Sequence, residues 1–173
     1  MIKKIKPVKD LQLERDENKI KFKWELHSQT LIAELSNENT PIPLVEKYHY
    51  VKNHCTKLLS IDGTRVYIPA GEIKDEDIAL KGGKLIKSTE IILKPGEPHE
   101  CHSNSARYWK RNKNTCKLVT GYALCSDDWL SHSWILTKKN RIIDSTIKAD
   151  KYYGVILNNT QAEQFCKKIL QQN

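Results

Sequence analysis

Cys101, His132 and Asp144 follow one another in the second half of the chain and have the side chains of a catalytic triad. In such a triad a thiol attacks a carbonyl carbon, an imidazole carries the proton, and a carboxylate orients the imidazole. The surrounding sequence places Cys101 at the start of a helix and the other two residues on successive strands. We therefore expect a cysteine-dependent acyl-transfer enzyme, and most specifically an amide hydrolase of the peptidase or deamidase type. A transglutaminase and a small-molecule amidase stay open as alternatives, because they share this machinery and differ in the pocket.

A cysteine reacts as the thiolate, and its ordinary pKa of about 8.5 leaves little thiolate at neutral pH. The N-terminus of a helix lowers that pKa because its unpaired N–H groups favour negative charge. Pro98 before Cys101 and the polar segment 103–105 after it are typical of a helix start. An imidazole beside the thiol lowers the pKa further. Cys101 gains both effects if His132 reaches it.

The segment from Thr137 to Arg141 predicts how His132 and Asp144 meet. It suits a three-residue hairpin loop with Asn140 in the left-handed conformation, which asparagine tolerates. That loop pairs Trp134 with Asp144 and makes His132 and Asp144 diagonal neighbours on one face. A two-residue loop would move Asp144 to the opposite face and separate the pair.

Apolar periodicity predicts the other elements. Strands are expected at 20–26, 65–69, 84–87, 91–93, 117–125, 131–137, 141–146 and 152–157. Helices are expected over 40–60, over 101–112, and from Thr160, where Thr160 to Glu163 has the form of a capping box. The predicted fold class is α+β, with the nucleophile-bearing helix packed on an antiparallel sheet that carries His132 and Asp144.

The length of 173 residues and the hydrophobic content of 39% are sufficient for one core, so a single domain over 1–173 is expected. Within it, 1–94 is predicted to be an N-terminal extension or cover with strands and one helix. The catalytic core is predicted over 95–173.

The formal charge of +8 favours acidic partners, and a protein or peptide substrate with an acidic surface is expected. The basic residues are scattered and are not interleaved with aromatic residues that could stack on bases, which argues against nucleic acid. Net charge alone nevertheless leaves a nucleic-acid- or protein-binding module without a catalytic triad as an alternative.

The five cysteines are odd in number and widely spaced, and the N-terminus lacks the apolar stretch of a signal peptide. No apolar run approaches the roughly 18 residues that a membrane span needs. A cytoplasmic protein with free thiols and no membrane insertion is therefore expected. Cys55 and Cys166 lie on apolar helix stripes and are predicted to be packing residues, as are Cys116 and Cys125.

A zinc site is the second alternative. Its possible ligands are His99, Cys101, His102, Cys116, Cys125 and His132. They contain no Cys-x-x-Cys or His-x-x-x-His pair, which disfavours zinc. The triad itself requires no cofactor.

The stretch from about residue 95 to 157 resembles the transglutaminase-like and papain-like cysteine enzymes. The likeness is carried by a cysteine at a helix start, by His132-Ser133-Trp134 and by Asp144-Ser145-Thr146. It implies an α+β fold in which Cys101 is the nucleophile, His132 the general base and acid, and Asp144 the orienting group.

One departure from this resemblance concerns the oxyanion hole. Papain-like enzymes keep a glutamine a few residues before the nucleophile, and none precedes Cys101. The oxyanion is then expected to be bound by backbone N–H groups near Cys101, with His102 or Asn104 as possible side-chain contributors. The alternatives for His102 are a plain helix-start residue, which is favoured, and a substrate contact, and the alternative for Asn104 is a helix cap. Trp134 is expected beside the His132–Asp144 pair, as a lid or as part of the core.

Overall fold

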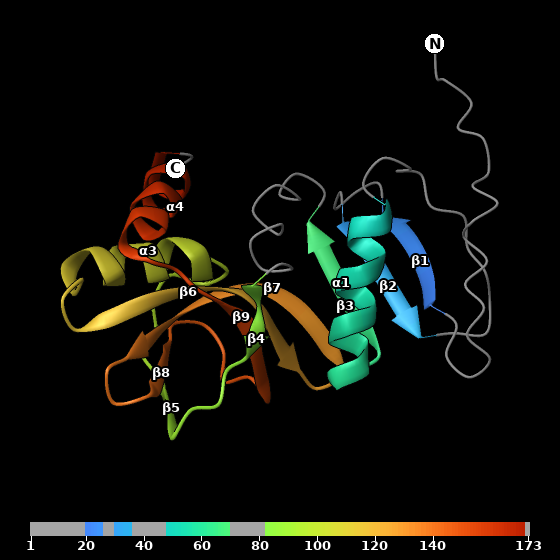
Figure 1. Cartoon of the computed structure of the whole chain (residues 1–173), viewed down its shortest axis with the longest axis horizontal. Coiled ribbons are helices and arrows are strands. Elements are labelled where there is room, and N and C mark those ends of the chain that lie inside the picture. The colour runs from blue at the N-terminus through green and yellow to red at the C-terminus, as the bar shows by residue number, and fades with distance from the viewer. Residues whose placement is uncertain (1–19, 26–29, 36–47, 70–81, 172–173) are drawn as a thin grey trace, which may run out of the picture. The chain divides into compact units, whose positions relative to one another are not determined.

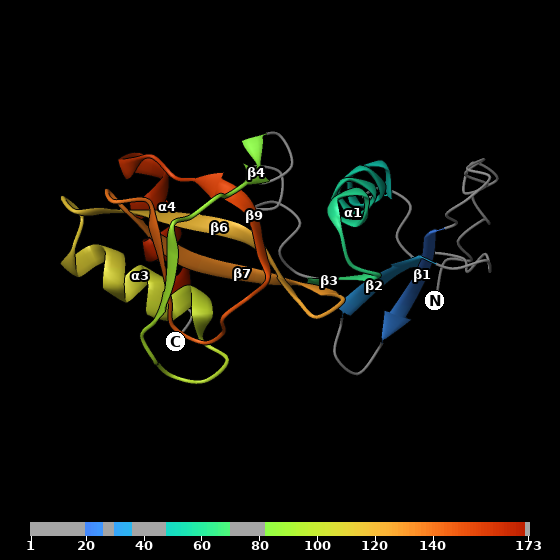
Figure 2. The same ribbon diagram turned by 90° about the horizontal axis from the view of Figure 1, so that it is seen from below.

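The computed structural model describes residues 20–25, 30–35, 48–69 and 82–171, which form two compact units of an α+β protein (Figure 1). The elements of the first unit are β1 (Ile20–Glu25), β2 (Thr30–Leu35), α1 (Tyr48–Ile61), β3 (Arg65–Pro69) and the beginning of β7 (Asp128–Thr137). β1, β2 and β3 pair antiparallel, and β3 pairs in parallel with the beginning of β7. Figure 2 shows α1 along one face of these strands.

The core of the first unit lies under α1. Cys55 and Leu58 from the helix are fully buried, as are Val66 from β3 and Trp129 from β7. The Trp129 Nε1–H donates to the carbonyl oxygen of Asp62 at 2.7 Å, which ties the end of α1 to β7. The buried position of Cys55 confirms its prediction as a packing residue.

The second unit contains every residue of the predicted triad. Its elements are β4 (Lys84–Leu85), β5 (Glu90–Leu93), α3 (Cys101–Arg111), β6 (Cys116–Cys125), the rest of β7, β8 (Arg141–Asp144), β9 (Lys151–Ile156) and α4 (Asn159–Gln171). β9 pairs antiparallel with β4 and β6, and β8 pairs antiparallel with β7 and parallel with β5. The strands of this unit are therefore mostly antiparallel, as predicted.

Each face of the β6–β7 sheet has its own core. α3 and α4 lie beside each other over one face (Figure 1), where Trp109 and Cys166 pack against Leu118. Trp134 and Tyr152 lie in the core of the opposite face. Because side chains alternate along β7, the strand contributes Ile135 to the α3 face and its neighbour Trp134 to the other.

The hairpin between β7 and β8 has the predicted loop and register. Ile135 pairs with Ile143 and Leu136 with Ile142. Asn140 has a φ of 56°, and its N–H donates to the carbonyl oxygen of Thr137 at 3.0 Å. The left-handed asparagine therefore closes a three-residue loop, and His132 and Asp144 share one face.

The helix α4 begins earlier than its predicted capping box. Asn158, rather than Thr160, is the capping residue: its Oδ1 accepts the N–H of Gln161, and Gln161 Oε1 accepts the N–H of Asn158. Leu157, directly before this pair, is buried. α4 therefore begins at Asn159, directly after its capping residue.

Other boundaries also differ from expectation. The second unit includes β4 and β5, so the division lies before residue 94, because these strands pair with β9 and β8. β2 was not predicted, and β8 ends at Asp144 because the Asp144 carboxylate bends the following chain. The predictions at 26 and 40–47 lie outside the described residues. Among the described helices, none has the length and apolar character needed to cross a membrane.

Candidate active site

Cys101 is the first residue of α3, as the sequence predicted. The N-cap residue Glu100 makes no side-chain cap, so it does not occupy the N–H groups of the first turn. Burial of the thiol acts to raise its pKa, but hydrogen bonds and positive charge from His102 and His132 outweigh burial. The pKa of Cys101 is thereby lowered to about 5, well below its ordinary range.

His132 connects the thiol to Asp144. Its Nε2 lies 2.7 Å from Asp144 Oδ2, and the two side chains are only 3% and 0% exposed. An ionised carboxylate only accepts hydrogen bonds, so Nε2 carries a proton. The other ring nitrogen, Nδ1, is then available to Cys101, to which the His132 ring is also hydrogen-bonded.

The pKa of His132 determines whether Cys101 or His132 carries the shared proton. Burial disfavours the charged ring, but the hydrogen bonds and negative charge of Asp144 and Cys101 outweigh burial and raise the pKa of His132 to about 9. Because the pKa of Cys101 is about 5, a thiolate and an imidazolium coexist across neutral pH. A thiolate beside an imidazolium is the arrangement that activates the nucleophile in cysteine-dependent enzymes.

The Asp144 carboxylate has partners at both oxygens. Oδ2 accepts from His132 and from the Tyr152 hydroxyl, at 2.7 and 2.9 Å. Oδ1 accepts the backbone N–H groups of Thr146 and Ile147, at 3.0 and 3.2 Å. Burial acts to raise the pKa of Asp144, but His132 and the two N–H groups outweigh it and lower the pKa. Asp144 therefore remains ionised and fixes the ring of His132.

His102 forms a second hydrogen bond to the Cys101 thiol. A residue of the sheet holds the His102 ring in position. Its Nδ1 lies 2.7 Å from the Ser133 hydroxyl, which in turn donates to Thr120 Oγ1 at 3.1 Å. Since that hydroxyl donates to Thr120, it accepts from His102 Nδ1–H. The alternation along β7 directs Ser133 toward α3 and its neighbour His132 toward Asp144.

Trp134 belongs to the core and is not a lid. It is 0% exposed and stacks on His132, with ring centroids 6.1 Å apart and planes 19° apart. Gly154 makes room for it, since a Cβ built at that position would lie 2.8 Å from Trp134 Cη2. Trp134 therefore packs against the face of the His132 ring.

Asn104 has a structural role in the loop before α3. Its Nδ2 donates to the carbonyl oxygen of Glu97 at 2.8 Å, and its Oδ1 accepts the Glu97 N–H at 3.2 Å. Both ends of the amide are thus engaged with the backbone. That an oxyanion would be bound by backbone N–H groups near Cys101 or by His102 therefore stays a prediction.

Tyr152 was missed by sequence reasoning. Its hydroxyl donates to Asp144 and accepts the Ala149 N–H at 3.2 Å. The only sequence signal was a tyrosine at the start of the strand that follows the Asp144 loop. A pattern of this kind identifies a buried aromatic residue without identifying its partner.

We expect Tyr152→Phe to weaken the orientation of the triad without breaking it. The change removes a donor to Asp144 and leaves the Ala149 N–H without its acceptor, at a cost of about 1–3 kcal/mol in the free energy of unfolding. Urea denaturation measures this loss. Tyr153→Phe is the matched control, because the Tyr153 hydroxyl bonds to the Gly83 carbonyl oxygen and not to the triad. Equal labelling of Cys101 by iodoacetamide in both variants would exclude a role for Tyr152 in the site.

The remaining cysteines do not join a metal site. Cys116 and Cys166 are buried, as predicted for packing residues, whereas Cys125 is partly exposed. Within the described part of the chain, no three His, Cys, Asp or Glu side chains are grouped so that they could hold a metal ion. The structure therefore gives the zinc alternative no site among these residues.

No protein family, curated protein or solved structure matches the chain.

Proposed function

We propose that this protein is a cysteine-dependent acyl-transfer enzyme that hydrolyses amides of a protein or peptide substrate, as a peptidase or a deamidase. The observation that carries the proposal is the continuous chain of hydrogen bonds from Cys101 through His132 to a buried, fully bonded Asp144. Perturbed pKa values on two coupled groups are typical of catalytic sites. In this site the lowered pKa of Cys101 and the raised pKa of His132 produce a thiolate next to an imidazolium.

The reaction follows from the protonation states of the pair. The Cys101 thiolate attacks the amide carbonyl carbon, and the oxyanion receives hydrogen bonds from backbone N–H groups in the first turn of α3, where Glu100 makes no side-chain cap. His132 donates its Nδ1 proton to the leaving nitrogen as the C–N bond breaks, which leaves a thioester on Cys101. The now neutral imidazole takes a proton from water, and the resulting hydroxide attack releases the acid and restores the thiolate. Asp144 holds the ring throughout.

The resemblance to the transglutaminase-like and papain-like enzymes supports the same assignment. In that arrangement the nucleophile begins a helix, and its histidine and aspartate lie on adjacent antiparallel strands. Cys101 begins α3, and β7 and β8 pair antiparallel. A papain-like or transglutaminase-like core in the second unit is therefore part of the proposal.

Mass spectrometry of a peptide mixture treated with the protein tests this function. We expect wild type to produce cleaved, deamidated or cross-linked peptides that Cys101→Ser does not produce. Cys125→Ser is the matched control, because Cys125 is the other partly exposed thiol. Equal products from wild type and Cys101→Ser would contradict the proposed nucleophile.

A further inference from the structure

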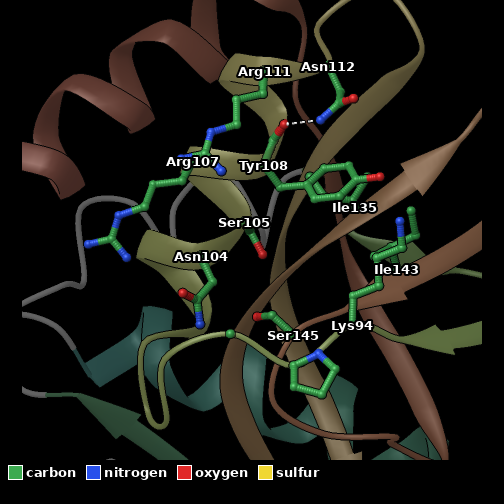
Figure 3. A pocket seen from close by; sticks show the side chains of 12 residues that line it. Lys94, Asn104, Ser105, Arg107, Tyr108, Arg111, Asn112, Ile135, Ile143 and Ser145 are labelled. Carbon is green, nitrogen blue, oxygen red and sulfur yellow. Dashed lines mark hydrogen bonds between the residues drawn. The ribbon is translucent and has the colours of Figure 1, made fainter.

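A cavity of about 380 Å³ lies along α3, beginning one helical turn beyond Cys101 (Figure 3). Its walls come from α3, from the segment Lys94–Gly96 after β5, and from β7 and β8. Ile135, Ile143, Pro95 and the ring of Tyr108 form apolar parts of the wall, and the other side chains that line it are polar or charged. None of the triad residues lines it, so the cavity is distinct from the reacting centre.

The charge of the cavity wall is positive. Lys94, Arg107 and Arg111 line it, and no Asp or Glu does. Arg107 is paired with Glu100 at 3.1 Å, whereas Lys94 lies over the ring of Tyr108 at 5.4 Å. Glu100 offsets part of the charge of Arg107, and with Lys94 and Arg111 the wall still has a net positive charge, which attracts anionic groups.

The hydroxyl of Ser145 adds an observation that is independent of charge. Its Oγ is buried and has no hydrogen-bond partner, although it lines the cavity. Figure 3 shows the Ser145 hydroxyl directed toward the α3 residues Asn104 and Ser105. The Ser105 hydroxyl also lies in the wall, but it already donates to the carbonyl oxygen of Ser133 at 2.9 Å. A buried hydroxyl without a partner costs free energy unless a ligand supplies one. A carboxylate in the cavity would accept its hydrogen bond.

The cavity is also within reach of a substrate held at the thiol. Ser105 lies one turn beyond Cys101 on the same helix, and Arg111 lies at its end. The axial distance from Cys101 to Arg111 is roughly 15 Å at the rise of an α-helix. An extended peptide covers that distance with about four or five residues.

We propose that this cavity binds the acidic side chains of a peptide substrate, two to five residues from the amide that reacts at Cys101. The inference rests on the proposed function and specifies its substrate class as acidic peptides. Arg107 and Arg111 bind the carboxylates, Ser145 donates a hydrogen bond to one of them, and Ile135 and Ile143 contact the aliphatic part of the same side chains.

Peptide chloroacetamides that alkylate Cys101 test this inference. The first probe carries Glu-Glu, separated from the electrophile by Gly-Gly, and its matched probe carries Gln-Gln in the same place. A second set of two probes carries the same residues on the opposite side of the electrophile along the peptide. The ratio of the Glu and Gln rates is compared at equal pH, so changes in thiol reactivity cancel. We expect the Glu probe of one set to react about fivefold faster or more at low salt, the effect of two partly exposed ion pairs.

The ratio of the Glu rate to the Gln rate is expected to fall to about one in the double variant Arg107→Gln/Arg111→Gln. In wild type it is expected to fall to about one at about 1 M salt, where charges are screened within about 3 Å. Lys138→Gln/Lys139→Gln is the matched control, because it removes the same charge from an exposed loop outside the cavity. It should retain the ratio. A ratio near one in wild type for both probe sets, or a ratio retained in Arg107→Gln/Arg111→Gln, would overturn the proposal.

Iodoacetamide, which is uncharged, separates this failure from failure of the proposed function. If wild-type Cys101 reacts rapidly with iodoacetamide at pH 6 but shows no preference for Glu, only the cavity proposal is wrong. If Cys101 is unreactive toward iodoacetamide at pH 6, the activated thiolate is absent. Both proposals then fail.

Discussion

Replacing His132 by alanine is expected to move the pH at which half of Cys101 becomes reactive from about 5 toward the ordinary thiol value of about 8.5. The direction follows because a thiolate loses the imidazolium that stabilises it. His102 also lowers the pKa of Cys101, so His132→Ala should move it part of the way. His102→Ala/His132→Ala should complete the shift.

The rate of iodoacetamide labelling at pH 6 gives the size of this effect. For the full shift, wild type has about 300-fold more thiolate than the double variant, and the lower basicity of that thiolate reduces its intrinsic reactivity about 30-fold. Labelling should therefore slow by about tenfold. Labelling followed by intact mass in a Cys125→Ser background isolates Cys101. An unchanged pH profile in the double variant would show that neither imidazole ionises the thiol.

Replacing Asp144 is expected to have the largest effect on both turnover and stability. In Asp144→Asn the amide no longer holds an imidazolium, so the pKa of His132 falls and the wrong ring tautomer is favoured. Comparable changes in other triads reduce kcat by about 10⁴-fold. We expect a reduction of about 10³-fold or more in the turnover of any substrate identified with wild type.

The stability effect is clearest in Asp144→Ala. Removing this 0% exposed carboxylate leaves His132, Tyr152 and two backbone N–H groups without an acceptor. Breaking such a buried pair costs about 3–5 kcal/mol in the free energy of unfolding. Urea denaturation measures the cost, and Asp150→Ala is a control at an exposed position. A loss below about 1 kcal/mol would mean that the Asp144 network does not form.

The sequence was sufficient to predict the features that depend on local geometry. Asn140 predicted the left-handed loop residue, and the loop length determined the register that joins His132 to Asp144. Pro98 and the polar residues after Cys101 located the start of α3. These predictions succeeded because hairpin loops and helix starts are determined within a few residues.

The features that depend on distant contacts could not be predicted. Tyr152 reaches Asp144, and Ser133 holds His102, only because the strands fold together. Asn104 was expected to be a possible oxyanion donor because the sequence did not show that the loop before α3 would fold back and place the Glu97 backbone at both ends of its amide. The buried hydroxyl of Ser145 is likewise a property of the packed structure.

The ionisation state of Cys101 tests the central claim most directly. A thiolate absorbs ultraviolet light near 240 nm, whereas a thiol does not, so the difference between wild type and Cys101→Ser follows this residue alone as pH changes. We expect one thiolate to be present at pH 7 and to be lost on acidification with a midpoint near pH 5. A Cys101 that ionises only above pH 8 would contradict the activated thiolate, and with it the enzyme.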